Sequence, residues 1–521
     1  MVVWSLRAKI RFSAIYSRHF IFALQFFSNH LVDNYEPKDH KPFKWIPVPE
    51  LSEKKSIMDE IVIFLLDGFK NQESQMYLHV ANNGYVYDNT LKVFPGYPLL
   101  LKGALYITDN SFIHQAYLLQ LLSFLINTGL FILAADIIYS LSRLVLRDEY
   151  LAYKAALLFC INPSSVFFSA HYAETFFSLC LFLGLYFLEK NGMGILSAVF
   201  LAVASFTKDV GFLNLIFIAY FSMKNVAVET ILFVRKRKNG KSPEKSIPDI
   251  FQDIWASTFF PGICNVLAAT VPFVFFQWFS YTAYCVRSTN NFHADLLKNG
   301  KFRKMPPMPN ENISSWCMDD TPMSYFYIHS TYGNFGIAQF RDIDELPLLL
   351  LSLPAIVLIG SQIYNFFLVN RRYALRFGLI DNALLGIPKL RVPPLVPTQS
   401  LPRETFIYLF HSIVLVVATS IIYPAQEVTR HLCSGSPILY WIAALATTPA
   451  QTSLVPILNL KDDNREEVAN RVEKRLNLRN EHATILLQEK ECGDMGNLVK
   501  FFFITSFLVG TGLYANDYPW A

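Results

Sequence analysis

The sequence predicts an all-α polytopic membrane protein, and three observations support that fold class. Of the 521 residues, 53% are hydrophobic and only 17% are charged, whereas soluble globular chains carry about 25% charged residues. Aromatic residues make up 15% of the chain, and its mean hydropathy is +0.30. Apolar segments of about 20 residues, the length that crosses a bilayer as a helix, recur along the chain. The net charge of +4, without any basic domain, argues against a nucleic-acid partner.

Several apolar segments predict membrane-spanning helices, beginning with a weaker one near residues 9–30. Basic residues interrupt that first segment and no cleavage-site pattern follows it, so we interpret it as an uncleaved anchor. No internal repeat is evident, which argues mildly against a transporter built from inverted repeats. The clear segments are 112–142, 165–188, 254–280, 345–369, 404–424, 437–457 and 498–516.

Two apolar regions are interrupted by polar residues. Residues 151–189 contain "INPSS" (161–165) and "HYAET" (171–175), and residues 196–223 contain "TKDVG" (207–211). Pro163 and Gly211 favour breaks in a helix. Irregular backbone at membrane depth is tolerated only where protein or water covers it. We therefore expect a pair of helices in each region, with both polar turns at one membrane face.

Basic residues in short loops predict the orientation, because such loops face the cytosol. The basic runs are 142–154, 234–241 and 370–376, and placing them in the cytosol gives about eleven crossings. The chain then forms a single integral membrane domain, 1–521. Residues 31–111 form the first lumenal loop, 281–344 a large lumenal loop, 425–436 a short one, and 459–497 a cytosolic loop.

The large lumenal loop carries two further signals of its location. Asn312 begins the sequon "NIS", an acceptor for N-glycosylation. Cys285 and Cys317 lie in the same loop, where an oxidising lumen allows a disulfide. The seven cysteines form no CxxC pair and no metal-ligand spacing. We therefore expect neither an obligatory metal nor another cofactor.

The unusual polar residues converge on the predicted lumenal face, where ionisable groups indicate a functional site by default. Each has a plainer alternative. Glu73 suits a solvated loop equally well, and Glu174 suits the N-terminus of a helix, where a carboxylate complements the dipole. Lys208 and Asp209 could each be paired with a partner only to offset the cost of burying a charge. Arg430 and His431 fit equally a pair of basic residues at the end of a loop, or a contact with anionic lipid head groups.

A lumenal carboxylate, scattered cations and many apolar spans fit transfer of a sugar from a lipid phosphate. Such a reaction needs a base for the acceptor hydroxyl, cations for the departing phosphate and an apolar groove for the lipid. It needs no nucleotide-binding domain, and no fingerprint of one is present.

Longer stretches resemble the PIG-V family, the second mannosyltransferase of glycosylphosphatidylinositol (GPI) anchor assembly. They include "YLHVANNGYVYDNTLKVFPGYP" (77–98), "ALLFCINPSSVFFSAHYAETFFSL" (156–179), "SSWCMDDTPMSYFYIHSTYGNFGIAQF" (314–340) and "EVTRHLCSGSPILYW" (427–441). The resemblance implies a GT-C type fold in the endoplasmic reticulum membrane and dolichyl phosphate mannose as the donor. It implies an α1,6-linked mannose on the GPI precursor, formed with inversion. Yeast members of the family suggest a small accessory membrane subunit.

The resemblance also implies roles for individual residues. The family has a Trp-Asp pair where this chain has Gln72 and Glu73. It has an "RSNG" element where this chain reads "KDVG" at 208–211. Glu73 is therefore the expected general base, aided by Glu174. The expected substrate-binding residues are Lys208 and Arg430 for the phosphate, His431 as a further contact, and Asp209, Tyr85, Pro95, Tyr97, Asn162 and Tyr172 around the pocket.

Two alternative functions remain open at the level of sequence. One is a dolichol-dependent mannosyltransferase that acts on another acceptor, such as a protein or an N-glycan precursor. The other, from a different class, is a membrane transporter or a non-catalytic scaffold.

Overall fold

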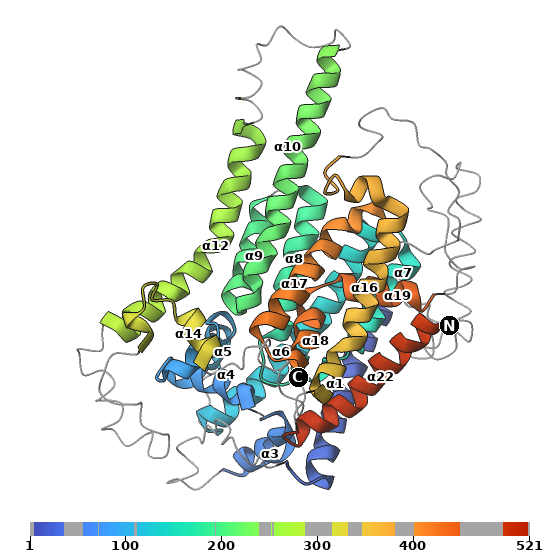
Figure 1. Ribbon diagram of the computed structural model, residues 1–521. Helices are drawn as coiled ribbons and strands as arrows, with labels where there is room; N and C mark the ends of the chain where they lie inside the picture. The colour runs from blue at the N-terminus through green and yellow to red at the C-terminus, as the bar shows by residue number, and fades with distance from the viewer. Residues whose placement is uncertain are drawn as a thin grey trace.

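The computed structural model describes residues 5–35, 56–70, 72–108, 112–192, 194–238, 252, 255–286, 315–331, 346–380, 401–448 and 493–518. Within these ranges every regular element is a helix and none is a strand. Long helices run side by side as a bundle, and shorter helices gather at one end of it (Figure 1). The all-α fold class predicted from the sequence is confirmed.

Six helical segments of the described chain are long and apolar enough to cross a membrane: Gln115–Leu146, Asp209–Arg235, Trp255–Val286, Leu350–Ala374, Arg403–Ile422 and Asp494–Ala515. They correspond to α6 (Gln115–Leu146), α10 (Leu215–Lys238), α12 (Phe260–Tyr281), α16 (Leu346–Ala374), α17 (Phe406–Ile422) and α22 (Asp494–Ala515). These segments fit an integral membrane protein. The count of about eleven crossings stays a prediction.

The centre of the bundle is formed by α7 (Glu149–Cys160), α8 (Glu174–Asn191), α9 (Ile195–Thr207) and α19 (Ile438–Ala446), packed with α6. Phe159 of α7 illustrates this packing. Its ring lies 4.8 Å from that of Phe131, 5.7 Å from that of Phe182 and 5.3 Å from that of Tyr440. Because this core is mostly apolar, charged residues buried in it or at its edge need partners of their own.

Both predicted helix breaks are present. Helix α7 ends at Cys160, and the 3-10 turn η3 (Ser165–Phe168) leads into α8. Helix α9 ends at Thr207, and η4 (Asp209–Asn214) leads into α10. Arg18 of α1 (Leu6–Leu31) supports the first break, donating to Ser165 O at 2.8 Å and Ser169 Oγ at 2.9 Å. These donors satisfy backbone and hydroxyl groups that the broken helix leaves without partners.

The short helices at one end of the bundle include α3 (Ile57–Leu66), α4 (Gln72–Asn83), η2 (Asp88–Lys92), α5 (Gly96–Ile107) and α14 (Ser324–Thr331). Helix α4 is amphipathic, with Glu73 in its first turn, and it buries Tyr77, Val80 and Ala81. The Cys285–Cys317 disulfide joins the segment after α12 to the residues just before α14. Helix α14 is thereby held against the short helices.

The structure corrects two predicted spans. Helix α8 begins at Glu174, not at residue 165, since the turn after Pro163 runs longer than expected. Helix α19 ends at Ala446 and has only nine residues, because Pro449 disfavours helical backbone at the preceding residue. Lys154 Nζ donates to the Thr447 carbonyl at this end, 2.6 Å away. Asn312 and residues 459–492 lie outside the described residues.

Candidate active site

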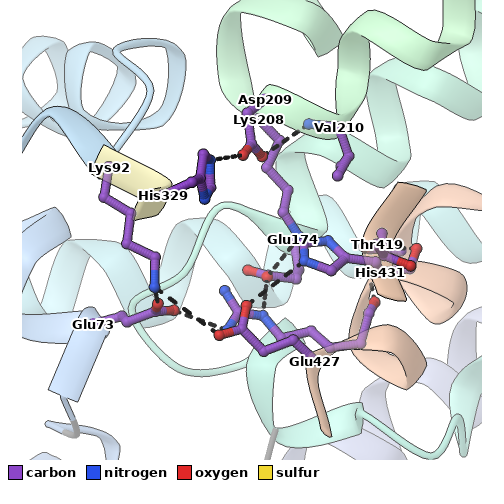
Figure 2. Close-up of polar contacts among 12 residues, drawn as sticks. Glu73, Lys92, Glu174, Lys208, Asp209, Val210, His329, Thr419, Glu427 and His431 are labelled. Carbon is purple, nitrogen blue, oxygen red and sulfur yellow. Dashed lines mark hydrogen bonds and ion pairs between the residues drawn. The ribbon is translucent and has the colours of Figure 1, made fainter. Parts of the chain in front are cut away.

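A cavity lies where α4 and η2 meet η4 and α18 (Ala425–Gly435). It is lined by charged, aromatic and a few apolar side chains from segments far apart in the sequence. They are Glu73, Met76, Tyr77, Lys92, Val93, Phe94, Thr207, Lys208, Asp209, Tyr423, Glu427, Arg430 and His431. Figure 2 shows how several of the charged side chains point toward one another.

Glu73, in the first turn of α4, meets a cation at each oxygen. Its Oε1 accepts from Lys92 Nζ, and its Oε2 accepts from Arg430 Nη1 at 2.9 Å (Figure 2). Burial alone would raise the pKa of this carboxyl, but the Lys92 ammonium and the Arg430 guanidinium outweigh burial and lower it below 4.5. Burial would lower the pKa of Lys92, yet Glu73 and Glu427 raise it. Both groups are therefore charged near neutral pH.

Arg430 links Glu73 to a second carboxylate beneath the cavity. Its Nε donates to Glu174 Oε1 at 2.5 Å, and Lys208 Nζ donates to the same oxygen at 3.0 Å. The Glu174 side chain is fully buried, and those of Arg430 and Lys208 are about 5% exposed. Buried charges are tolerated only when paired in this way. The arrangement fixes two cations at the cavity wall.

Aromatic rings hold the Arg430 guanidinium in place. Its central carbon lies 4.7 Å from the ring centroid of Tyr172 and 4.8 Å from that of Phe167, distances typical of cation–π contacts. Burial would lower the pKa of Arg430, but Glu174, Glu73 and Glu427 raise it well above its usual range. The guanidinium is therefore a permanent positive charge in a fixed orientation.

Asp209 pairs with a histidine that comes from the far side of the cavity. His329 Nε2 of α14 lies 3.3 Å from Asp209 Oδ2, and the amide of Val210 donates to Asp209 Oδ1 at 2.8 Å (Figure 2). The His329 ring packs against Tyr325 and Tyr423 at 4.6 Å and 5.0 Å. Helix α14 thus closes one side of the site.

Helix α18 presents three polar residues at helical spacing: Glu427, Arg430 and His431. His431 Nε2 lies 3.6 Å from Glu427 Oε2, and the His431 ring packs on Tyr423 at 4.4 Å. Burial, with Lys208 and Arg430 close by, lowers the pKa of His431 well below 6.5. His431 is therefore a neutral imidazole at neutral pH.

A family model described as Mannosyltransferase (PIG-V) matches residues 7–521, almost the whole chain. The chain belongs to the PIG-V mannosyltransferase family. The "GPI alpha-1,6-mannosyltransferase 2" of Mus musculus is 27% identical to it over 487 residues, 92% of this chain and 93% of that protein. The protein of the same name from Homo sapiens is 26% identical over 527 residues, 97% of each chain. The "GPI mannosyltransferase 2" of Drosophila melanogaster is 23% identical over 501 residues, 94% of this chain and 95% of that one.

Most of the charged residues expected from the PIG-V pattern meet at this cavity, whereas the smaller pocket residues lie behind its walls. The Tyr97 hydroxyl is hydrogen-bonded to Ser123 Oγ at 2.8 Å, and the Tyr97 ring packs against that of Tyr77. Tyr85 donates to the Val93 carbonyl at 2.7 Å. Pro95 caps the N-terminus of α5, and Asn162 donates to the Phe159 carbonyl at 3.0 Å. Tyr97 and Tyr85 thus contact the cavity residues Tyr77 and Val93, whereas Pro95 and Asn162 are not among the lining residues.

The sequence did not single out Lys92 and Tyr423, which line the cavity, or His329, which pairs with Asp209 beside it. Lys92 lies within the quoted 77–98 stretch, three residues before Pro95. His329 lies within the quoted 314–340 stretch. Within the described part of the chain, no three His, Cys, Asp or Glu side chains converge as a metal site would require.

Proposed function

We propose that this PIG-V family mannosyltransferase moves a mannosyl group from dolichyl phosphate mannose to the GPI-anchor precursor. The new bond would be α1,6 and would form on the lumenal side of the endoplasmic reticulum membrane. The names of the relatives support the acceptor and the linkage. The observation that carries the proposal is the ionised carboxylate of Glu73, which lies in a cavity walled by Lys92, Lys208 and Arg430.

In the proposed reaction Glu73 is the general base. It takes the proton of the acceptor hydroxyl as that oxygen attacks C1 of the mannosyl group. The bond between C1 and the phosphate oxygen breaks, and dolichyl phosphate leaves with the electron pair. A single displacement inverts the β-linked donor into an α-linked product. No covalent intermediate and no cofactor are needed.

Cations stabilise the negative charge that grows on the leaving phosphate. Arg430 and Lys208 are the proposed phosphate contacts. Lys92 is a third cation that lines the cavity, across from Lys208. Glu174 aids the reaction from behind the cavity, because its Oε1 fixes both Lys208 and Arg430. A preorganised site of this kind needs no reorientation of its charges during the reaction. Tyr172 would hold the Arg430 plane, and Asp209 would fix His329.

The fold proposed for this activity is of the GT-C type, with about eleven crossings in one domain, 1–521. Residues 31–111 and 281–344 would face the lumen and 459–497 the cytosol. The Cys285–Cys317 disulfide supports an oxidising environment for the second of these loops. A small accessory membrane subunit, as in yeast members of the family, would assist the enzyme, and Asn312 would carry a glycan.

The test is mannose transfer in microsomes that lack the endogenous enzyme, with labelled dolichyl phosphate mannose. Glu73→Gln keeps the shape but removes the base, and should lower kcat by about 100- to 10,000-fold. Glu60→Gln is the matched control, since Glu60 is exposed on α3. Full transfer by Glu73→Gln would refute the assignment of the base.

The same cells separate the alternative functions. Cells without the enzyme should accumulate a GPI intermediate with one mannose, and wild type but not Glu73→Ala should restore surface GPI-anchored proteins. A normal GPI glycan with altered protein or N-glycan mannosylation would point to another acceptor. Rescue by Glu73→Ala would point to a transporter or a scaffold.

A further inference from the structure

We propose that Tyr423 and His431 form the subsite that binds the hydroxyl groups of the donor's mannosyl residue. The inference rests on the proposed function and adds the part of the site that recognises the sugar. The residues discussed above handle the proton and the phosphate; none of them accounts for recognition of a neutral polyhydroxylated ring.

Tyr423 and His431 carry polar atoms that lack partners. The Tyr423 hydroxyl and both ring nitrogens of His431 are buried and have no hydrogen-bond partner among the described residues. The two residues are only 3% and 2% exposed, and both line the cavity. Buried polar groups are nearly always hydrogen-bonded, because leaving them unpaired is unfavourable. A ligand in the cavity would supply the missing partners.

The chemistry of these groups fits a sugar better than a phosphate. A phenol and a neutral imidazole can each donate and accept a hydrogen bond, and so can a sugar hydroxyl. Neither group carries a positive charge to offset a phosphate. Glu427, 3.6 Å from His431 Nε2, adds an acceptor for a further hydroxyl. The Tyr423 and His431 rings contact each other in a tilted arrangement, which holds these groups in fixed positions.

The position of the pair favours the donor's sugar over the acceptor's. His431 directly follows Arg430 on α18, and the sugar of the donor is bonded directly to its phosphate. A phosphate held by Arg430 would therefore bring the mannosyl hydroxyls to Tyr423 and His431. Figure 2 shows Glu73 and Lys92 approaching from the opposite side of the cavity, away from His431. The acceptor hydroxyl has to reach that side to meet the base.

Deoxygenated donors test the proposal directly. Dolichyl phosphate mannose and its 2-, 3-, 4- and 6-deoxy analogues are compared as substrates of wild type, Tyr423→Phe and His431→Phe. Both substitutions keep an aromatic ring at this contact: Tyr423→Phe removes only the hydroxyl, and His431→Phe replaces the imidazole with a slightly larger apolar ring. Each should lower kcat/KM for the natural donor by about 3- to 10-fold, as expected for loss of one uncharged hydrogen bond. With the one analogue that lacks the partner hydroxyl, the same substitution should cause no further fall in kcat/KM.

Tyr408→Phe is the matched control. Tyr408 lies on α17, whose C-terminal cap is Tyr423, and donates to Glu189 Oε1 at 2.8 Å away from the cavity. This variant should show the same loss, if any, with every donor. Amounts of folded protein are compared for all variants, and His431→Phe serves as an independent second test if Tyr423→Phe lowers that amount.

An equal penalty with every analogue for both Tyr423→Phe and His431→Phe would overturn the proposal. So would a change in KM for the GPI precursor with KM for the donor unchanged, since that result assigns the pair to the acceptor. Failure of the wild-type enzyme to use the natural donor would instead refute the proposed function, so the two failures are distinguishable.

Discussion

At the scale of single residues, the site depends on how Glu73 shares its two oxygens between Lys92 and Arg430. An ion pair with a base has two opposing effects. It keeps the carboxylate ionised at low pH, and it lowers the affinity of that carboxylate for the acceptor proton. A base is most effective when its pKa lies near the working pH. Entry of a phosphate next to Lys92 would relax this restraint, because the cation then has a second anion to neutralise.

The pH dependence of transfer should report this pairing. In the wild type the pKa of Glu73 lies below 4.5, so the acid limb of kcat/KM should lie below that pH. Lys92→Met removes the strongest lowering influence while burial remains, and burial raises the pKa. The acid limb should therefore move to higher pH. The measurement is the pH profile of kcat/KM in both proteins.

Stability should follow the same sign. A carboxyl with a depressed pKa stabilises the folded state above its unfolded pKa, and that contribution is lost as the pH falls through the folded value. Glu73 should therefore stabilise the enzyme above about pH 4.5. Lys92→Met should reduce this contribution to stability.

In the pH profile of kcat/KM, an acid limb that stays in place in Lys92→Met would show that another group limits transfer at low pH.

At the scale of elements, α18 connects the charged groups of the N-terminal and C-terminal halves. Arg430→Met would leave the fully buried Glu174 with Lys208 alone. Breaking a buried pair at one partner typically costs about 3–5 kcal/mol. We expect a loss of that order in the free energy of unfolding, together with loss of transfer.

Thermal unfolding of the detergent-solubilised enzyme measures the effect of Arg430→Met. Arg372→Met, at an exposed position near the end of α16, is the control and should unfold like the wild type. Arg430→Lys should not restore the site, because one ammonium cannot reproduce the two directed bonds of the guanidinium. Wild-type stability in Arg430→Met would contradict the buried network.

Helices α5 and α9 touch at Gly96, which sets the position of Lys208. A Cβ on Gly96 would lie 2.6 Å from Thr207 Oγ1 and 2.9 Å from both the Phe206 carbonyl oxygen and Thr207 Cα. Since two of these are backbone atoms, Gly96→Ala should push the end of α9 away and displace Lys208. A displacement of about 1 Å can lower a rate by about 100-fold.

Gly103→Ala provides the control for Gly96→Ala on the same helix. A Cβ at Gly103 meets nothing within 4 Å, and alanine is the better helix former. Gly103→Ala should therefore leave both transfer and stability at or above the wild-type level. Equal transfer by the two variants in the microsome assay would contradict the role given to the α5–α9 contact.

At the scale of the whole molecule, sequence patterns predicted the helical class, both broken helix pairs and most of the charged site. Pro163 and the polar "TKDVG" stretch are local signals, so they can be seen without a structure. The partners of those charges are not local. Lys92, His329 and Tyr423 become site residues only because distant segments fold together. No spacing pattern in the sequence predicts those tertiary contacts. The short α19 shows the converse, since an apolar stretch alone does not say where a helix ends.

The proposed topology is also tested on the whole molecule. If residues 281–344 face the lumen, Asn312 should carry an N-glycan and Cys285–Cys317 should be oxidised. Endoglycosidase treatment of microsomal protein should then increase the mobility of the wild type and leave Asn312→Gln unchanged. Labelling of Cys285 by a thiol reagent confined to the cytosolic side would contradict this orientation.

The Arg430 bonds also determine when the site can exist during biosynthesis. Arg430 follows Glu73 by 357 residues and Glu174 by 256. At about 5–20 residues per second, roughly 20–70 s pass between synthesis of Glu73 and synthesis of its guanidinium partner. Until then Glu73 and Glu174 have only Lys92 and Lys208 as partners, and a chain that ends before α18 never gains the guanidinium that joins the two carboxylates. Synthesis of α18 is thus the step that joins the two earlier ion pairs into one network across the candidate site.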